Sequence, residues 1–171
     1  MDPEGRVLTG CSAVKGQGSL QDAPPSRVKE SHNKNAVGAY VDVPVRVRYA
    51  DTDKMGIVYY GTYPQYFEIG RSEFMREKGF AYRKFEEMGY HLVVTGIDIK
   101  YHNAATYDDL LSVRTSLSDV KSRGLTFHYE IFKDGAIIVD GHTKHICVDG
   151  ERKPIRIPSD VMEIFRNASS A

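Results

Sequence analysis

The chain has 171 residues, and its 23 Lys and Arg balance 23 Asp and Glu, so the formal net charge is zero. This balance leaves no basic excess to draw the chain to nucleic acid or an anionic membrane, which argues against both as main partners. Hydrophobic residues make up 41% of the chain, enough for one packed domain. No apolar stretch approaches the roughly 18 residues that a membrane span needs, so we expect none.

The two cysteines, Cys11 and Cys147, cannot form a disulfide scaffold or a cysteine-based zinc site. Residues 8–11 resemble a lipoprotein cleavage box, but the residues before them include two acids and a proline. Such a start cannot form the apolar core of a signal peptide, and its acidity argues against a transit peptide. We therefore expect a cytoplasmic protein.

Residues 1–38 differ in composition from the rest of the chain. They contain none of the 18 aromatic residues, yet they hold 3 of the 7 prolines and 5 of the 15 glycines. Such a segment buries too little apolar surface to offset the entropy that is lost on ordering. We predict that residues 1–38 form a flexible leader and that residues 39–168 form one domain.

The first predicted element of this domain is a strand over residues 41–49, where valines and Tyr49 alternate with polar residues and Pro44. Because proline cannot donate to a ladder, Pro44 lies at a sheet edge or near the start of the strand. A helix follows, from Gly61 or Thr62 to Lys78. One face of it carries Tyr63, Tyr66, Phe67, Gly70 and Phe74.

The glycine on that face, Gly70, costs roughly 1 kcal/mol against alanine in a helix interior. Its presence predicts that another element passes close to the helix there.

A short helix over residues 81–87 and four strands with short turns follow. The strands are expected over residues 92–102, 111–117, 125–131 and 136–148, and a last helix from Ser159 or Asp160 to Arg166. The order βαββββ predicts an α+β fold with a mostly antiparallel sheet wrapped around one long helix. Such a sheet has free edges, so pairing with a second subunit is expected.

The loop between the first strand and the long helix could carry chemistry. Asp51 and Asp53 are two residues apart, and Gly56 and Gly61 permit backbone shapes that other residues resist. The helix start offers unpaired N–H groups that stabilise an oxyanion or a polarised carbonyl. A carboxylate beside such donors suits acyl transfer. The same pattern is also typical of turn chemistry or capping, whereas a Ca²⁺ loop lacks its remaining oxygen ligands.

At this point the sequence resembles a known family, the 4-hydroxybenzoyl-CoA thioesterase type of hot-dog acyl-CoA thioesterase. The short-chain thioesterase associated with the Tol–Pal system belongs to the same group. The resemblance covers about residues 41–165. It rests on Tyr49-x-Asp51-x-Asp53-x-x-Gly56-Ile-Val-Tyr59-Tyr60-x-x-Tyr63, on Phe67-Glu68-x-x-Arg71-x-Glu73, and on later matches at Tyr107-Asp108-Asp109-Leu110, Thr126-Phe127 and Lys153-Pro154.

The resemblance implies that Asp53 is the catalytic carboxylate, which attacks the thioester carbonyl or activates a water. It implies that the backbone N–H at about Tyr60 polarises the carbonyl oxygen, and that Asp51 shapes the loop. It also implies dimers or tetramers, a site at each subunit junction and no metal. Some relatives have His in place of Tyr60, so the tyrosine leaves Asp53 without a second acid/base group.

Four further residues are substrate-binding candidates. Tyr59 and Tyr63 could line an acyl or aryl pocket with Tyr60, although such tyrosines also pack at helix starts. Lys121 and Arg123 flank a predicted turn, where relatives hold the phosphates of CoA. Basic residues in a turn are otherwise simply solvated.

No cofactor or metal is expected, and the CoA thioester is the substrate. His142 and His145 point to opposite faces of one predicted strand, so they cannot share a metal, and no histidine spacing suits zinc. The resemblance implies a thioester hydrolase that releases a free acid and CoA.

Two other functions remain open. A hot-dog dehydratase or hydratase of acyl thioesters usually needs a histidine with an acidic partner, and no histidine lies near the loop or the start of the long helix. A non-catalytic acyl-CoA-binding hot-dog domain usually carries a DNA-binding extension, but residues 1–38 show no helical apolar pattern and no basic block.

Overall fold

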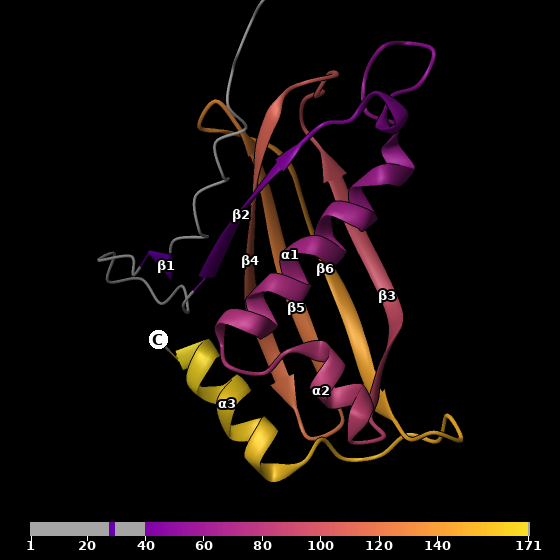
Figure 1. Ribbon diagram of the computed structural model, residues 1–171, viewed down its shortest axis with the longest axis vertical. Coiled ribbons are helices and arrows are strands. Elements are labelled where there is room, and N and C mark those ends of the chain that lie inside the picture. Colours follow the sequence, from indigo (N-terminus) through magenta and orange to yellow (C-terminus); the bar gives the residue numbers. More distant parts are fainter. Residues whose placement is uncertain (1–27, 30–39, 171) are drawn as a thin grey trace, which may run out of the picture.

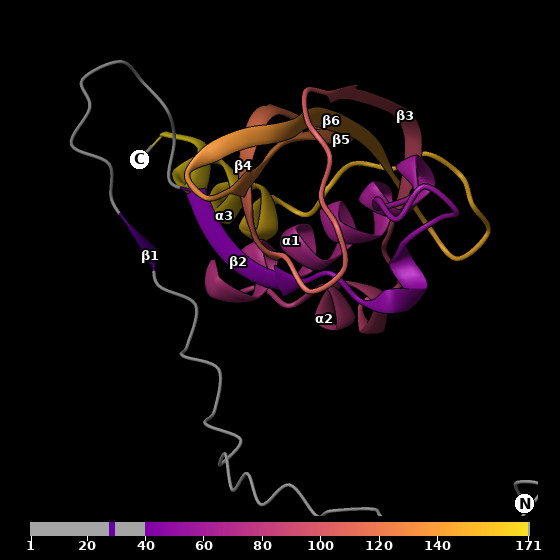
Figure 2. The same ribbon diagram turned by 90° about the horizontal axis from the view of Figure 1, so that it is seen from above.

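The computed structural model describes residues 28–29 and 40–170, in which a curved antiparallel sheet packs on one side of the long helix α1 (Tyr63–Glu77) (Figure 1). The strand order is β1-β2-β4-β5-β6-β3. The view from above shows the sheet wrapping around α1 (Figure 2), which confirms the predicted α+β arrangement. The strands are β1 (Val28–Lys29), β2 (Tyr40–Arg46), β3 (His91–Tyr101), β4 (Leu110–Lys121), β5 (Gly124–Lys133) and β6 (Ala136–Val148).

The two-residue strand β1 falls within the predicted leader. Val28 is opposite Val41 of β2, and Lys29 is opposite Tyr40. The rest of the leader lies outside the described residues, as does residue 39, where the predicted domain begins. The division into a flexible leader and one domain therefore stays a prediction.

Strand β2 ends at Arg46, three residues earlier than predicted. The chain turns here because the backbone N–H of Arg48 donates to the Asp51 carboxylate, which forms a 3₁₀ turn, η1 (Tyr49–Asp51). Tyr49, predicted on the buried side of the strand, is 80% exposed. Among the described residues only β1 pairs with the outer edge of β2, so the edge position predicted for Pro44 is confirmed.

Helix α1 buries the predicted aromatic face against the sheet. The Phe67 ring stacks on the Tyr129 ring of β5, with 4.2 Å between centroids. A side chain added at Gly70 would place its Cβ 2.9 Å from Val113 Cγ1 on β4, closer than real Cβ contacts. The predicted close approach at Gly70 is thus confirmed, and the glycine lets the helix lie directly on the sheet.

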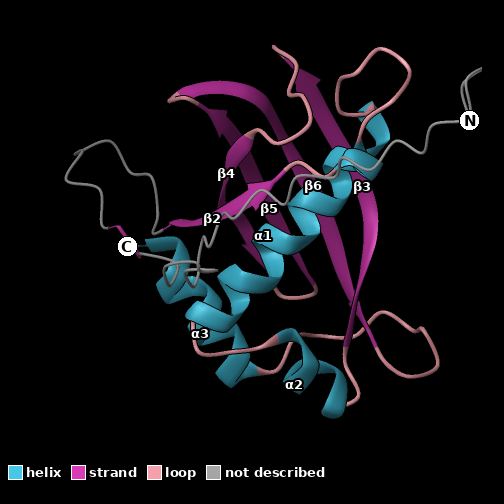
Figure 3. Ribbon diagram, turned by 45° about the horizontal axis from the view of Figure 1, so that its top comes forward, coloured by secondary structure: helices cyan, strands magenta, loops and turns pink. Residues whose placement is uncertain are grey.

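Two more helices cover the end of the sheet where α1 finishes (Figure 3). Helix α2 (Tyr82–Glu87) buries Phe85, and α3 (Ser159–Ser170) buries Phe165. Helix α3 runs four residues past the predicted Arg166, and Ala168 in this extension is still buried. No described helix has the length and apolar composition that crossing a membrane requires.

Strand β3 is the other edge of the sheet, since among the described strands it pairs only with β6. Ile97 is 50% exposed and Tyr101 is 48% exposed, although the alternation predicts half-buried positions. Val93 and Val94 are exposed as well. The strand therefore presents apolar side chains beside an unpaired backbone edge.

Candidate active site

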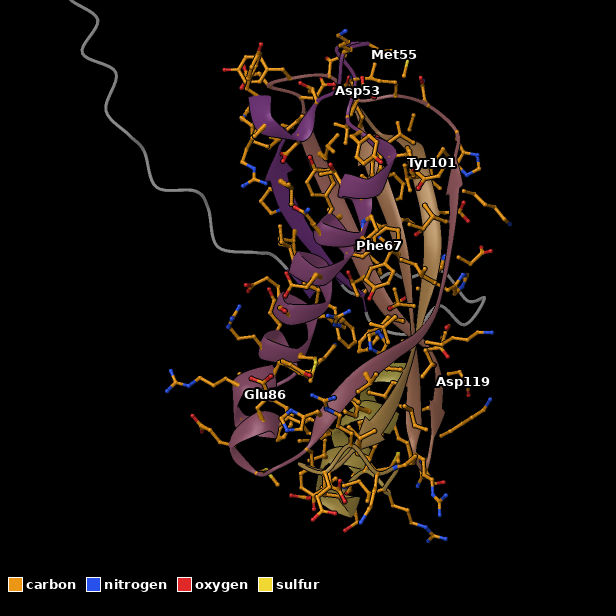
Figure 4. All side chains as sticks on the ribbon, turned by 90° about the vertical axis from the view of Figure 1, so that its right-hand side faces the viewer. Asp53, Met55, Phe67, Glu86, Tyr101 and Asp119 are labelled. Atoms are coloured by element: carbon orange, nitrogen blue, oxygen red, sulfur yellow. The ribbon has the colours of Figure 1, made fainter. Side chains whose placement is uncertain are left out.

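The loop that carries Asp53 is a small hairpin. Thr52 and Val58 form an antiparallel bridge, and the N–H of Asp53 donates to the carbonyl of Ile57 at 2.9 Å. The turn closes when the N–H of Gly56 donates to the carbonyl of Asp53 at 2.9 Å, with Gly56 at a φ of +73° that favours glycine. The hairpin lies at one end of the molecule, where Figure 4 labels Asp53.

The Asp53 side chain takes part in this turn with one oxygen only. Its Oδ1 accepts the N–H of Met55 at 2.8 Å, so the turn chemistry expected as an alternative is present. Its Oδ2 has no donor among the described residues. The half-buried carboxylate is thus held in place while one oxygen remains available.

Asp51 anchors the base of the hairpin. It is only 3% exposed, and its carboxylate accepts from the Arg48 guanidinium at 2.7 Å and from the Tyr66 hydroxyl at 3.0 Å. The hydrogen bond with Arg48 holds the pKa of Asp51 below its usual value. Burial, followed by the bond to Asp51, raises the pKa of Tyr66. These contacts agree with the loop-shaping role that the resemblance implies.

The backbone of Asp51 also positions the start of the helix. Its carbonyl accepts the N–H of Tyr59 at 2.9 Å, and the carbonyl of Tyr59 accepts the N–H of Thr62 at 2.8 Å. The bond between Thr62 and Tyr59 belongs to a second 3₁₀ turn, η2 (Tyr60–Thr62), which leads directly into α1. Within the part of the chain that the structure describes, the N–H of Tyr60 meets no acceptor.

A cavity of about 310 Å³ joins the hairpin to the helix start. It brings together three of the predicted residues, Asp53, Tyr60 and Tyr63. Tyr59 is not part of the wall, and its ring packs on the Tyr60 ring with 4.5 Å between centroids. The wall consists of Asp53, Met55, Ile57, Val58, Tyr60, Tyr63, Tyr101, His102, Asn103 and Ala104.

Sequence reasoning missed the part of this wall that β3 contributes. Tyr101 and His102 follow Tyr60 by about 40 residues, and only the pairing of β3 with β6 brings them there. The expectation that no histidine lies near the loop is wrong, because His102 borders the same cavity as Asp53. The His102 Nε2 lies 2.8 Å from the Asp140 carboxylate.

The single chain does not bring Lys121 and Arg123 to this cavity. They flank the turn between β4 and β5, and Lys121 pairs with Asp119 at 2.9 Å. Figure 4 shows Asp119 far from Asp53, toward the other end of the molecule.

The opposite orientation predicted for two histidines of β6 is confirmed. The His142 ring lies 4.6 Å from the His128 ring of β5, whereas His145 is 4% exposed and its Nε2 is 2.7 Å from the Thr143 hydroxyl. In residues 28–29 and 40–170 no three His, Cys, Asp or Glu side chains are grouped as metal ligands.

A family model for the thioesterase-like superfamily matches residues 47–165, from the end of the first long strand into the last helix. The chain belongs to this superfamily. The membership confirms the class of enzyme expected from the sequence, a thioester hydrolase, and the hot-dog fold.

Relatives in the superfamily include both sequences and solved structures. The acyl-CoA thioesterase YbgC of Haemophilus influenzae is 36% identical over 126 residues, which is 72% of this chain and 93% of the relative. The structure of DHNA-CoA thioesterase from Staphylococcus aureus has a TM-score of 0.72 and 31% identity, and the match covers 74% of this chain and 89% of that one. Protein TT1821 of Thermus thermophilus also has a TM-score of 0.72 and 31% identity, and the match covers 74% and 98%.

Proposed function

We propose that this thioesterase hydrolyses an acyl- or aroyl-CoA thioester to the free acid and CoA, with Asp53 and the backbone N–H of Tyr60 as the reacting groups. One observation supports this most directly. Asp53, with a carboxylate oxygen that has no donor, and Tyr60, with a backbone N–H that has no acceptor, line the same cavity, as judged from the described residues. The YbgC relative, named as an acyl-CoA thioesterase, supports the choice of substrate.

In the general-base form of the reaction, Oδ2 of Asp53 takes a proton from a water while the water oxygen adds to the thioester carbon. The negative charge moves to the carbonyl oxygen, where the N–H of Tyr60 at the start of α1 stabilises it. When the intermediate collapses, the carbon–sulfur bond breaks and the departing sulfur takes the proton. In the nucleophilic form, Oδ2 itself adds to the carbon, and the carbon–sulfur bond breaks as CoA leaves as a thiolate, which takes a proton from water. Water then hydrolyses the resulting anhydride, which releases the acid and restores the Asp53 carboxylate.

The acyl group then contacts the apolar and aromatic part of the cavity, where Tyr63 and Tyr101 lie beside Met55 and Ile57. Tyr63 is buried and its ring lies 5.6 Å from the Tyr101 ring, so the two rings form one aromatic side of the cavity. Because Tyr59 packs behind Tyr60, it supports the wall without lining it.

A second copy of the chain completes the site in this proposal. The open edge of β3 and its exposed side chains, Val93, Val94 and Ile97, suit antiparallel pairing with the same edge of another copy. Antiparallel pairing reverses the second copy end for end. Its Lys121 and Arg123 then come toward the end that carries Asp53, where they can bind CoA phosphates. The cytoplasmic location expected from the sequence stays a prediction.

Asp53→Asn tests the proposal, because asparagine keeps the shape of the side chain and cannot act as a base. We expect turnover to fall roughly 10²–10⁴-fold, the range for a missing general base. The assay measures thiol release from acyl-CoA esters, from acetyl to palmitoyl, and from aryl thioesters. Asp134→Asn, at an exposed turn outside the cavity, is the matched control. Equal turnover by wild type and Asp53→Asn would refute the assignment.

A dehydratase or hydratase is the second candidate, since His102 borders the cavity and has an acidic partner in Asp140. The direction of the ring argues against it. Asp140 is opposite Lys100 in the pairing of β3 with β6, so it lies on the face of the sheet away from Tyr101. Tyr101 reaches the carbonyl of Tyr60, whereas the His102 ring lies against Asp140 on that other face. A change of a double bond in 3-hydroxyacyl- or enoyl-CoA, abolished by His102→Gln, would favour this candidate.

Binding of the acyl-CoA esters of the panel without turnover would favour a non-catalytic acyl-CoA-binding domain.

A further inference from the structure

Tyr101 links the open edge of the sheet to the helix start. It is the last residue of β3, and its hydroxyl donates to the carbonyl oxygen of Tyr60 at 3.1 Å. Its ring meets the ring of Tyr63, the first residue of α1, in an edge-to-face contact with 5.6 Å between centroids. Figure 4 places Tyr101 near the end of the molecule that carries Asp53.

The hydrogen bond from Tyr101 holds the carbonyl of Tyr60, which is part of the backbone beside the Tyr60 N–H. That N–H belongs to the peptide between Tyr59 and Tyr60, which is planar and moves as a unit. On one side, the carbonyl of Asp51 holds the N–H of Tyr59. On the other side, the Tyr101 hydroxyl holds the carbonyl of Tyr60. The peptide's own carbonyl, that of Tyr59, accepts the N–H of Thr62 at 2.8 Å. The Tyr101 hydroxyl therefore supplies the one of these three restraints that comes from β3.

We propose that Tyr101 is a positioning residue, which fixes the direction of the Tyr60 N–H and makes this direction depend on the edge strand β3. Its effect on catalysis rests on the proposed function, since a misdirected donor stabilises an oxyanion less well. The side chain transfers no proton in this role. It transmits the position of β3 to the turn η2.

The variant Tyr101→Phe removes the hydroxyl and keeps the ring against Tyr63. The matched control is Tyr82→Phe, because the Tyr82 hydroxyl also bonds to a backbone group of β3, the N–H of Leu92 at 3.2 Å, at the opposite end of the strand. In Tyr101→Phe we expect kcat to fall about three- to tenfold, the effect of one hydrogen bond, with KM nearly unchanged. Tyr82→Phe should keep the wild-type kcat.

A second measurement follows the turn directly and does not depend on activity. Amide hydrogen exchange in residues 59–62 should be about three- to tenfold faster in Tyr101→Phe and unchanged in Tyr82→Phe. Unchanged exchange in Tyr101→Phe would overturn the proposal, and so would faster exchange with a wild-type kcat. If the wild type hydrolysed no thioester of the panel, the proposed function would fail, while the exchange result would still decide whether Tyr101 holds the turn.

Discussion

The two loop aspartates have different surroundings, and only one of them is free to react. Asp51 is buried, and its carboxylate is occupied by Arg48 and Tyr66. Asp53, which lines the cavity, uses one oxygen for the turn, and its other oxygen has no donor among the described residues. The division follows from the hairpin, which places one residue at its base and the other at its tip.

His145 is the residue whose protonation should matter most for stability near neutral pH. Burial and, to a smaller extent, the nearby Arg71 guanidinium together lower the pKa of His145 to about 4. The unfolded chain, with an ordinary pKa near 6.5, therefore binds a proton before the folded chain does. The contribution of neutral His145 to the free energy of unfolding is complete above about pH 6.5 and is lost as the pH falls toward 4.

Between pH 7 and pH 5 this group alone should cost about 2 kcal/mol of unfolding free energy. Urea titrations at the two pH values measure the loss, and His145→Gln should show a loss smaller by that amount. His142 also has a pKa lowered by burial, so some pH dependence should remain in the variant. An identical pH dependence in wild type and variant would contradict the prediction.

At the scale of elements, the contact of α1 with the sheet depends on Gly70. Gly70→Ala should destabilise the protein by about 1–3 kcal/mol, because the added methyl group clashes with Val113 and Thr115 of β4. The clash should outweigh the better helix propensity of alanine. Thermal unfolding measures the change, with Gln65→Ala on the exposed face of α1 as control. A more stable Gly70→Ala would show that the sheet can yield at this point.

Local patterns predicted most of the elements, since alternation and helical spacing depend on neighbouring residues. The bounds of β6 agree with prediction, and those of α1 do so within two residues. The end of β2 was misjudged because the Asp51 side chain turns the backbone there, which alternation does not register. The Asp53 loop was found through its motif, whereas Tyr101 reaches the cavity through strand pairing between distant segments.

At the scale of the whole molecule, the open edge of β3 determines the assembly that we propose. Ile97→Lys places a charge on this edge and should convert an oligomer into smaller species, as measured by sedimentation velocity. Ile137→Lys, at a comparably exposed position of β6, is the control. A sedimentation profile of Ile97→Lys equal to that of the wild type would show that the copies meet elsewhere.

The role of Lys121 and Arg123 belongs to this scale too. Their positions in the sequence predict a turn, which the structure contains. The sequence carries no information on their distance from Asp53, because that distance depends on how a second copy docks.

The separation of Asp53 from the β4–β5 turn within one chain has a genetic consequence. Under antiparallel pairing, each catalytic centre combines the carboxylate of one protomer with the basic turn of the other. A chain that lacks the carboxylate and a chain that lacks the basic side chains are then both inactive alone. Co-expressed, they would form mixed assemblies in which the intact halves meet, so two loss-of-function alleles would complement each other.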